Sequence, residues 1–208
     1  MNSAILNQDL HTASVRRGRR LEYLTITWNS LEGVIAVGAG ILAGSIALVG
    51  FGIDSVIEVS SGGIILWRLL SGEHREQRAL KLVGVSFLAL ATYVGIDAVK
   101  SLWLIEPPEA SYVGIALAAL SLAVMPVLAR AKRKVASQLN SRAMHADSRQ
   151  TDICAYLSAI LLGGLLLNAI FDWWWADPIA ALVMVPIIAR EGIGALRGET
   201  CCDVDECA

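Results

Sequence analysis

The hydropathy pattern of this chain consists of long apolar stretches separated by short polar ones. Each apolar stretch runs for about 20 residues, the length that an α-helix needs to cross the roughly 30 Å hydrocarbon core of a bilayer. Strands of a membrane barrel would be shorter and would alternate in polarity, which these stretches do not. The pattern therefore predicts an all-α, polytopic membrane protein. Six transmembrane helices are expected, at residues 21–41, 45–70, 79–104, 110–130, 150–171 and 177–197.

Basic residues gather at alternate ends of these segments. The first, third and fifth predicted loops contain no Lys or Arg, whereas basic residues precede the first segment and fill the second and fourth loops. The positive-inside rule then places both termini in the cytoplasm. We expect a basic cytoplasmic segment at 1–20, a transmembrane domain at 21–198 and a cytoplasmic tail at 199–208.

The composition agrees with a membrane protein. Hydrophobic residues make up 55% of the 208 positions, charged residues only 17%, and the mean hydropathy of +0.58 is too high for a soluble domain of this size. The net charge of −2 averages a basic rim with acidic loops and an acidic tail, so it says little about partners. Because the basic clusters lie at membrane ends, they indicate topology and lipid headgroup contact rather than nucleic-acid binding. We expect an integral protein of the cell membrane.

Two carboxylates interrupt the second apolar segment. Asp54 and Glu58 are one helical turn apart and therefore share a helix face. Placing a carboxylate near the bilayer centre costs about 2.5–3.5 kcal/mol, so an intramembrane pair predicts a functional site. Two anions side by side need a cation, a proton or a basic neighbour to neutralise them. Asn29 and Glu32 share a face of the first segment. They either line the same cavity and proton path or bond to another helix.

Cysteines occur in two places. Cys154 lies in the fifth apolar segment, and Cys201, Cys202 and Cys207 lie in the tail. Because a cytoplasmic tail is in a reducing environment, a disulfide framework is not expected there. The tail offers three thiols and three carboxylates, which suit a soft or borderline cation such as Zn²⁺, but their spacing matches no standard zinc module. The tail either captures metal transiently or is simply solvated.

The run from Gly44 to Glu58 reads Gly-Ser-Ile-Ala-Leu-Val-Gly-Phe-Gly-Ile-Asp-Ser-Val-Ile-Glu. It resembles the second-helix signature of the cation diffusion facilitator (cation efflux) family of metal transporters. The Ala-Asp177-Pro178 start of the sixth segment is similar to that family as well, and there we expect Asp177 to cap the helix. The resemblance covers about 21–198. It implies a proton-coupled exporter of divalent transition metals, with a tetrahedral site made by two residues on helix 2 and two on helix 5.

Asp54 and Glu58 match the family's helix 2 ligands, but the helix 5 motif is degenerate. The family pattern is Ala-Asp-x-x-His-x-x-x-Asp, and its ungapped match here gives Asp147, Gln150 and Cys154, with Gln in place of His and Cys in place of Asp. A thiolate is an excellent zinc ligand and an amide a poor one. A second face of the same helix carries His145 and Asp152. We favour the first face as the one that meets the helix 2 pair.

The function implied is exchange of one divalent ion, Zn²⁺ first, against protons. Ligands must lose protons to bind a metal and release it when they regain them. Familiar family members carry a soluble domain after the sixth helix. The present sequence is expected to be a short member without it, to dimerise through its transmembrane helices and to need no prosthetic group. The alternative is a metal-binding sensor or accessory protein that translocates nothing. An enzyme is not expected, since the sequence has no Ser–His pair, His-Glu-x-x-His motif or phosphate loop.

Overall fold

The computed structural model describes the backbone of residues 2–71, 76–105 and 108–197. Side chains are described in the same ranges, except at residues 2–11, 68–83, 86, 142–143, 146 and 195. All regular structure in these ranges is helical, which confirms the predicted all-α class. The helices are α1 (Asn2–Ala43), α2 (Ile46–Ser71), α3 (Glu76–Leu104), α4 (Tyr112–Leu139), α5 (Arg142–Phe171) and α6 (Ala176–Arg197).

Polar residues end the helices where the chain must turn. Ser111 caps α4 by accepting a hydrogen bond from the backbone N–H of Gly114, and Ser141 caps α5 in the same way from Met144. Between α4 and α5 only two residues lie outside a helix. The first, Asn140, has φ 48° and ψ 42°, a left-handed conformation that Asn tolerates better than most residues. The α4–α5 connection is therefore a tight, fully capped turn.

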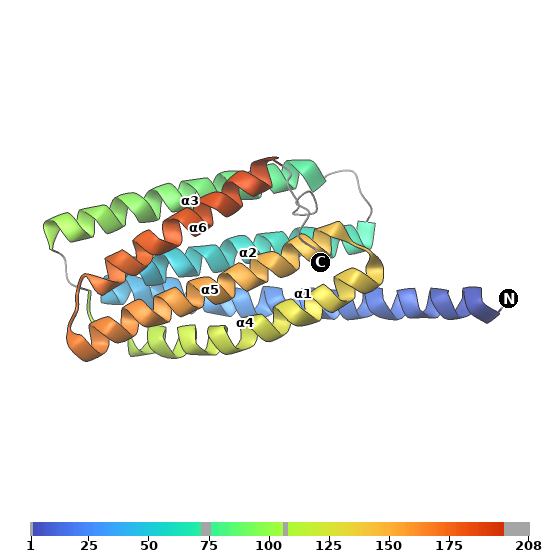
Figure 1. Ribbon diagram of the computed structural model, residues 1–208, viewed down its shortest axis with the longest axis horizontal. Coiled ribbons are helices and arrows are strands. Elements are labelled where there is room, and N and C mark those ends of the chain that lie inside the picture. Colours follow the sequence, from blue (N-terminus) through green and yellow to red (C-terminus); the bar gives the residue numbers. More distant parts are fainter. Residues whose placement is uncertain (1, 72–75, 106–107, 198–208) are drawn as a thin grey trace, which may run out of the picture.

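The helices run up and down in a bundle (Figure 1). Helices α1, α2, α4 and α5 form a four-helix group, in which α1 packs against α2 and α4, and α5 packs against α4 and α2. Helices α3 and α6 pack mainly against each other and join the group through α2 and α5. Fully buried side chains such as Leu48, Phe51, Met125, Leu157 and Leu161 fill the interior. This arrangement brings the middle of α2 against α5.

Glycine allows α1 and α2 to approach closely. A Cβ atom added at Gly52 would lie 2.7 Å from Cγ2 and 2.8 Å from the backbone nitrogen of Val37, and one added at Gly40 would lie 2.7 Å from Val49. Real side-chain atoms do not approach this closely. Small residues give helices dispersion contacts in lipid, where the hydrophobic effect does not drive them together. The α1–α2 contact therefore depends on these two glycines.

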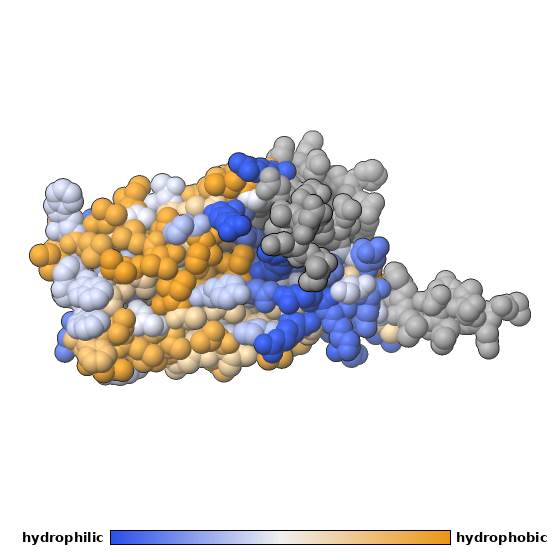
Figure 2. All heavy atoms as spheres, viewed as in Figure 1, coloured by the Kyte–Doolittle hydropathy of each residue, from blue (hydrophilic) through white to orange (hydrophobic). Residues whose placement is uncertain are grey.

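Within the part of the chain that the structure describes, five helical segments are long and apolar enough to cross a membrane: Thr12–Ala43, Ile46–Trp67, Phe87–Leu104, Tyr112–Leu139 and Asp147–Phe171. Helix α6 carries Asp177, Arg190 and Glu191 and lies beside α3. Large apolar side chains also point outward, including Leu42 at 84% and Val34 at 76% exposure. Figure 2 shows apolar side chains over most of the face in view. The molecule is a polytopic integral membrane protein.

One end of the bundle is hydrophilic. Helix α1 begins and α6 ends at that end (Figure 1), and hydrophilic side chains gather over it (Figure 2). Trp173 and Trp175 follow α5, with their rings stacked at a centroid distance of 5.1 Å. Helix α1 is continuous from Asn2, so no break in the backbone marks the division expected at residue 20. The start of α1 and the end of α6 thus lie at the same end of the bundle (Figure 1), as the predicted topology requires.

Candidate metal site

Asp54 and Glu58, here called the acidic pair, lie on α2 inside the bundle. Asp54 is 5% exposed and Glu58 1% exposed. Oε1 of Glu58 accepts a hydrogen bond of 2.9 Å from the hydroxyl of Thr151 on α5, whereas Oε2 has no partner among the described residues. No nitrogen of a described Lys or Arg side chain lies within 4.0 Å of either carboxylate. The acidic pair therefore lacks a direct basic partner within the described part of the chain.

Cys154 lies next to the acidic pair. It is 1% exposed, and its thiol is beside the carboxylate of Glu58 and in electrostatic reach of Asp54. Gln150, one turn earlier on α5, is partly buried, and its Nε2 lacks a hydrogen-bond partner among the described residues. The first of the two candidate faces of α5 is therefore the one turned toward α2.

The second face of α5 turns away from the acidic pair. The side chain of Asp152 is 31% exposed and forms an ion pair with Arg133 of α4, whose side chain is 47% exposed. His145 is partly buried, and its backbone carbonyl accepts a hydrogen bond from Ser148. Neither residue is brought to the acidic pair. Cys201, Cys202 and Cys207 lie outside the described residues.

Helix α1 adds polar groups to the same interior. Glu32 is 1% exposed, and its Oε2 accepts a hydrogen bond of 3.2 Å from the hydroxyl of Ser55 on α2. Asn29 is completely buried, and neither its amide nitrogen nor its oxygen has a partner among the described residues. Ser121 of α4 is buried near Glu32. Because an unpaired buried polar group costs about 1–3 kcal/mol, this concentration marks a place for a guest ion or water.

Asp147 has a basic partner that the sequence did not suggest. Its Oδ2 lies 2.5 Å from Nζ of Lys132 on α4, and the same Nζ lies 3.3 Å from Oε2 of Glu22 on α1. We call Glu22, Lys132 and Asp147 the buried charge cluster, since the exposure of each residue is 3% or less. Lys132 belongs to the basic run of the fourth loop in sequence, but its position is inside the protein. In this arrangement Asp147 is held by an ammonium group.

Thr151 connects the buried charge cluster with the acidic pair. Its hydroxyl oxygen is 2.9 Å from Oε1 of Glu58 and 3.2 Å from the backbone oxygen of Asp147. One weak indication of this role was present in the sequence, because residue 151 falls on the same helix face as Asp147 and Cys154. A threonine in an apolar helix carries no other mark of function.

The described side chains around the acidic pair do not form a complete coordination shell. Within the described ranges, no group of three or more His, Cys, Asp and Glu side chains is close enough to hold a metal ion as it stands. The geometry instead provides two carboxylates on α2 and a thiol on α5. An ion bound here would draw ligands from both helices.

Asp177 joins two segments that are far apart in the sequence. Its Oδ1 accepts a hydrogen bond of 2.5 Å from the hydroxyl of Ser45, and its Oδ2 accepts bonds from the backbone N–H groups of Ile46 at 3.0 Å and Ala47 at 3.4 Å. The prediction that Asp177 caps its own helix is wrong, because α6 begins one residue earlier and the carboxylate caps α2 instead. The acceptor that α2 needs is supplied across the bundle.

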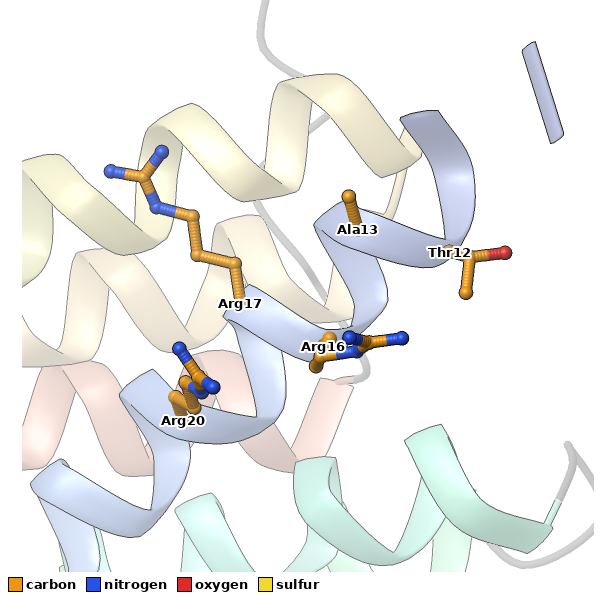
Figure 3. A pocket seen from close by; sticks show the side chains of 5 residues that line it. All are labelled: Thr12, Ala13, Arg16, Arg17 and Arg20. Carbon is orange, nitrogen blue, oxygen red and sulfur yellow. The ribbon is translucent and has the colours of Figure 1, made fainter. Parts of the chain in front are cut away.

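A separate cavity lies at the hydrophilic end. It has a volume of about 430 Å³ and is lined by residues of α1: Thr12, Ala13, Arg16, Arg17 and Arg20. Figure 3 shows that the arginine side chains leave the helix in different directions rather than converging on one point. Exposed cations at a membrane boundary agree with the positive-inside topology.

Six helices around an intramembrane acidic pair define a polytopic membrane protein with a polar site in its interior. Residues 81–198 match the family model of the cation efflux transmembrane domain. The chain belongs to the cation efflux family. The matched residues include α4, α5 and α6 and begin after the α2 segment that carries the acidic pair.

Alignments with individual relatives cover more of the chain than the family model does. An uncharacterized transporter of Synechocystis sp. is 26% identical over 160 residues, which are 71% of this chain and 52% of the relative. An uncharacterized transporter of Methanocaldococcus jannaschii is 28% identical over 179 residues, 80% of this chain and 63% of the relative. Transmembrane protein 163 of Xenopus laevis is 26% identical over 194 residues, 89% of this chain and 69% of the relative. The chain thus spans between 52% and 69% of the length of these relatives.

Proposed function

We propose that this protein transports a divalent transition-metal cation across the membrane, with Zn²⁺ as the first candidate. The observation that carries the proposal is the acidic pair, Asp54 and Glu58, which is buried in an apolar bundle without a basic partner within 4.0 Å among the described side chains. Two anions in such a place need a cation or protons. Membership of the cation efflux family and the two relatives named as transporters support the same function.

The ligands that we propose are the carboxylates of Asp54 and Glu58 and the thiol of Cys154. Thiolate sulfur favours Zn²⁺ and its soft or borderline neighbours over Mg²⁺ and Ca²⁺, and carboxylate oxygen is acceptable to all of them. Gln150, one turn before Cys154 on α5, offers only an amide oxygen, a weak ligand. Asp147 matches the family motif, but an ion would have to compete with Lys132 for it. Asn29 and Glu32 line the polar interior from α1 and are the proposed proton path.

Proton coupling follows from the ligand chemistry. Carboxylate and thiol groups bind a metal ion only when they are deprotonated, so protons that arrive at the site favour release of the ion. Because α2 and α5 contribute separate ligands, a change in the α2–α5 contact would break the coordination and open the site. We therefore infer a metal/proton antiporter that works in the direction of efflux. Assembly as a homodimer through the transmembrane helices remains a prediction.

Zinc flux in proteoliposomes tests the proposal. Vesicles that contain the protein and a fluorescent zinc reporter are exposed to Zn²⁺ with a pH gradient, and the rate is compared with that of the Asp54→Asn/Glu58→Gln double variant. We expect at least a tenfold loss of flux in the double variant and none in Asp152→Asn, whose side chain pairs with Arg133 on the outer face. Undiminished flux in the double variant would contradict the proposal. Zinc binding without flux in the unmodified protein would instead identify a non-transporting metal-binding protein.

A further inference from the structure

The buried charge cluster is not used by the proposed metal site. Its three members come from three helices, since Glu22 lies on α1, Lys132 on α4 and Asp147 on α5. The Nζ atom of Lys132 is 3.3 Å from Glu22 Oε2 and 2.5 Å from Asp147 Oδ2, and all three side chains are fully buried. An ammonium group thus lies between two carboxylates inside a membrane protein.

The charges in the cluster do not balance. One ammonium faces two carboxylates, which leaves a net charge of −1 when all three groups are ionised. Glu22 Oε1 and Asp147 Oδ1 have no hydrogen-bond donor among the described residues, so acceptor capacity on both carboxylates is unused. These oxygens belong to side chains that are fully buried. The two carboxylates therefore present more acceptor oxygens at this position than the ammonium of Lys132 bonds.

A purely structural ion pair does not explain this composition. Removing two charges from water costs several kcal/mol for each ion, and a well-packed apolar pair is often equally stable. A second buried carboxylate would add to that cost without a second ammonium to compensate it. Two carboxylates around one cation are also the arrangement of a small cation site, and here the cation is the ammonium group of Lys132.

We propose that Lys132 is a resident cation. Its ammonium occupies a cation position formed by Glu22 and Asp147 and keeps metal ions out of it, so that the acidic pair alone exchanges cations. The second half of this statement rests on the proposed function, whereas the first half does not. Without the ammonium, the position would present only carboxylate oxygens, and it would take a divalent ion that prefers oxygen ligands, such as Mn²⁺.

Manganese binding in detergent tests the resident cation independently of transport. The background is the Asp54→Asn/Glu58→Gln variant, in which the acidic pair no longer binds, and free Mn²⁺ is counted by its electron paramagnetic resonance signal. Adding Lys132→Ala to this background is expected to create one new Mn²⁺ site per chain. The matched control, Lys132→Ala with Asp147→Asn, is expected to bind at least tenfold more weakly. A Lys132→Ala protein that binds no more Mn²⁺ than its background would overturn the proposal.

A second variant covers the case in which Lys132→Ala does not fold. Lys132→Gln removes the charge but keeps most of the side-chain length. In the Asp54→Asn/Glu58→Gln background, we expect Mn²⁺ at a hundredfold excess over its Kd to raise the unfolding temperature of the Lys132→Gln variant by about 5–10 °C, and to leave the background with Lys132 intact unchanged. No Mn²⁺-dependent shift in Lys132→Gln would contradict the resident cation. Loss of zinc flux in the acidic-pair variant is a separate result, so the two proposals fail separately.

Discussion

Substitution of Asp177 by alanine separates α6 from the start of α2. The carboxylate accepts three hydrogen bonds from the beginning of α2, namely from the hydroxyl of Ser45 and the backbone N–H groups of Ile46 and Ala47. Ser45 and Asp177 are both 1% exposed, so water does not replace the lost acceptor readily. The change therefore leaves buried donors unsatisfied at a helix N-terminus.

The expected cost follows from the geometry of these bonds. Two of them are short, at 2.5 and 3.0 Å, and each donor left unsatisfied costs about 1–3 kcal/mol, while the third bond, at 3.4 Å, contributes little. Removal of a buried carboxylate returns part of this cost, because its desolvation is no longer required. Ser45 also continues to cap the backbone N–H of Leu48. We expect a net loss of about 3 kcal/mol for Asp177→Ala and about 1 kcal/mol for Asp177→Asn, which keeps one acceptor oxygen.

Thermal unfolding in one detergent, followed by far-UV circular dichroism, measures this loss. For a chain of this size a loss of about 3 kcal/mol corresponds to a fall of about 6–12 °C in the unfolding temperature. Asp172→Asn is the matched control, because residue 172 is exposed at the same end of the bundle and Asn tolerates its left-handed φ of 52°. If Asp177→Ala unfolds within a degree or two of that control, the cross-bundle cap does not stabilise the protein as argued.

Three further substitutions test the site and the packing around it. Thr151→Val keeps the side-chain shape but removes the hydroxyl that donates a hydrogen bond to Glu58, so zinc affinity measured by calorimetry is expected to fall about threefold to tenfold. Unchanged zinc affinity would show that this hydrogen bond does not orient the carboxylate. Gly52→Ala places a methyl group in the α1–α2 contact and is expected to lower the free energy of unfolding by about 1–3 kcal/mol. The control is Gly38→Ala, whose added Cβ has no neighbouring atom within 4 Å and which is expected to be neutral or stabilising. Equal unfolding temperatures of the two variants would contradict the close approach of α1 and α2. Cys154→Ser replaces a soft ligand by a hard one, so Cd²⁺ affinity is expected to fall more than Mn²⁺ affinity, and a parallel fall in both would exclude the thiol as a ligand.

The positions of the helices were predictable because residues that contact the hydrocarbon core must be apolar. The ends of the helices were not predictable, because a helix can continue beyond the hydrocarbon core where its polar residues still favour helical structure. Helix α4 reaches Leu139 and α5 begins at Arg142, so these helices extend by nine and eight residues beyond the ranges 110–130 and 150–171 that the apolar pattern delimited. The capping residues Asn140 and Ser141 mark that turn more accurately than hydropathy does.

The interior carboxylates of α2 were predictable because charge within an apolar run is costly and therefore conspicuous. Lys132 was not, since a lysine between arginines at a membrane boundary has the same appearance whether it points to water or to a buried acid. Its partners, Glu22 and Asp147, are 110 and 15 positions away, and only the packing of α1 and α5 against α4 brings them together. The cap that Asp177 provides was missed for the same reason, because its partner Ser45 is 132 positions away.

The hydrogen bond between Asp177 and Ser45 holds the N-terminal end of α2 against α6. The helix has 26 residues and is roughly 39 Å long, so a tilt of about 10° around the tethered end carries the far end through roughly 7 Å. Asp54 and Glu58 lie about 12 Å and 18 Å from the tethered end, so the same tilt moves them by about 2 Å and 3 Å. These shifts match or exceed the length of a metal–oxygen bond, which is about 2 Å. The bond between Asp177 and Ser45 therefore lets a small tilt of α2, if transport involves one, move both proposed α2 ligands by a bond length or more.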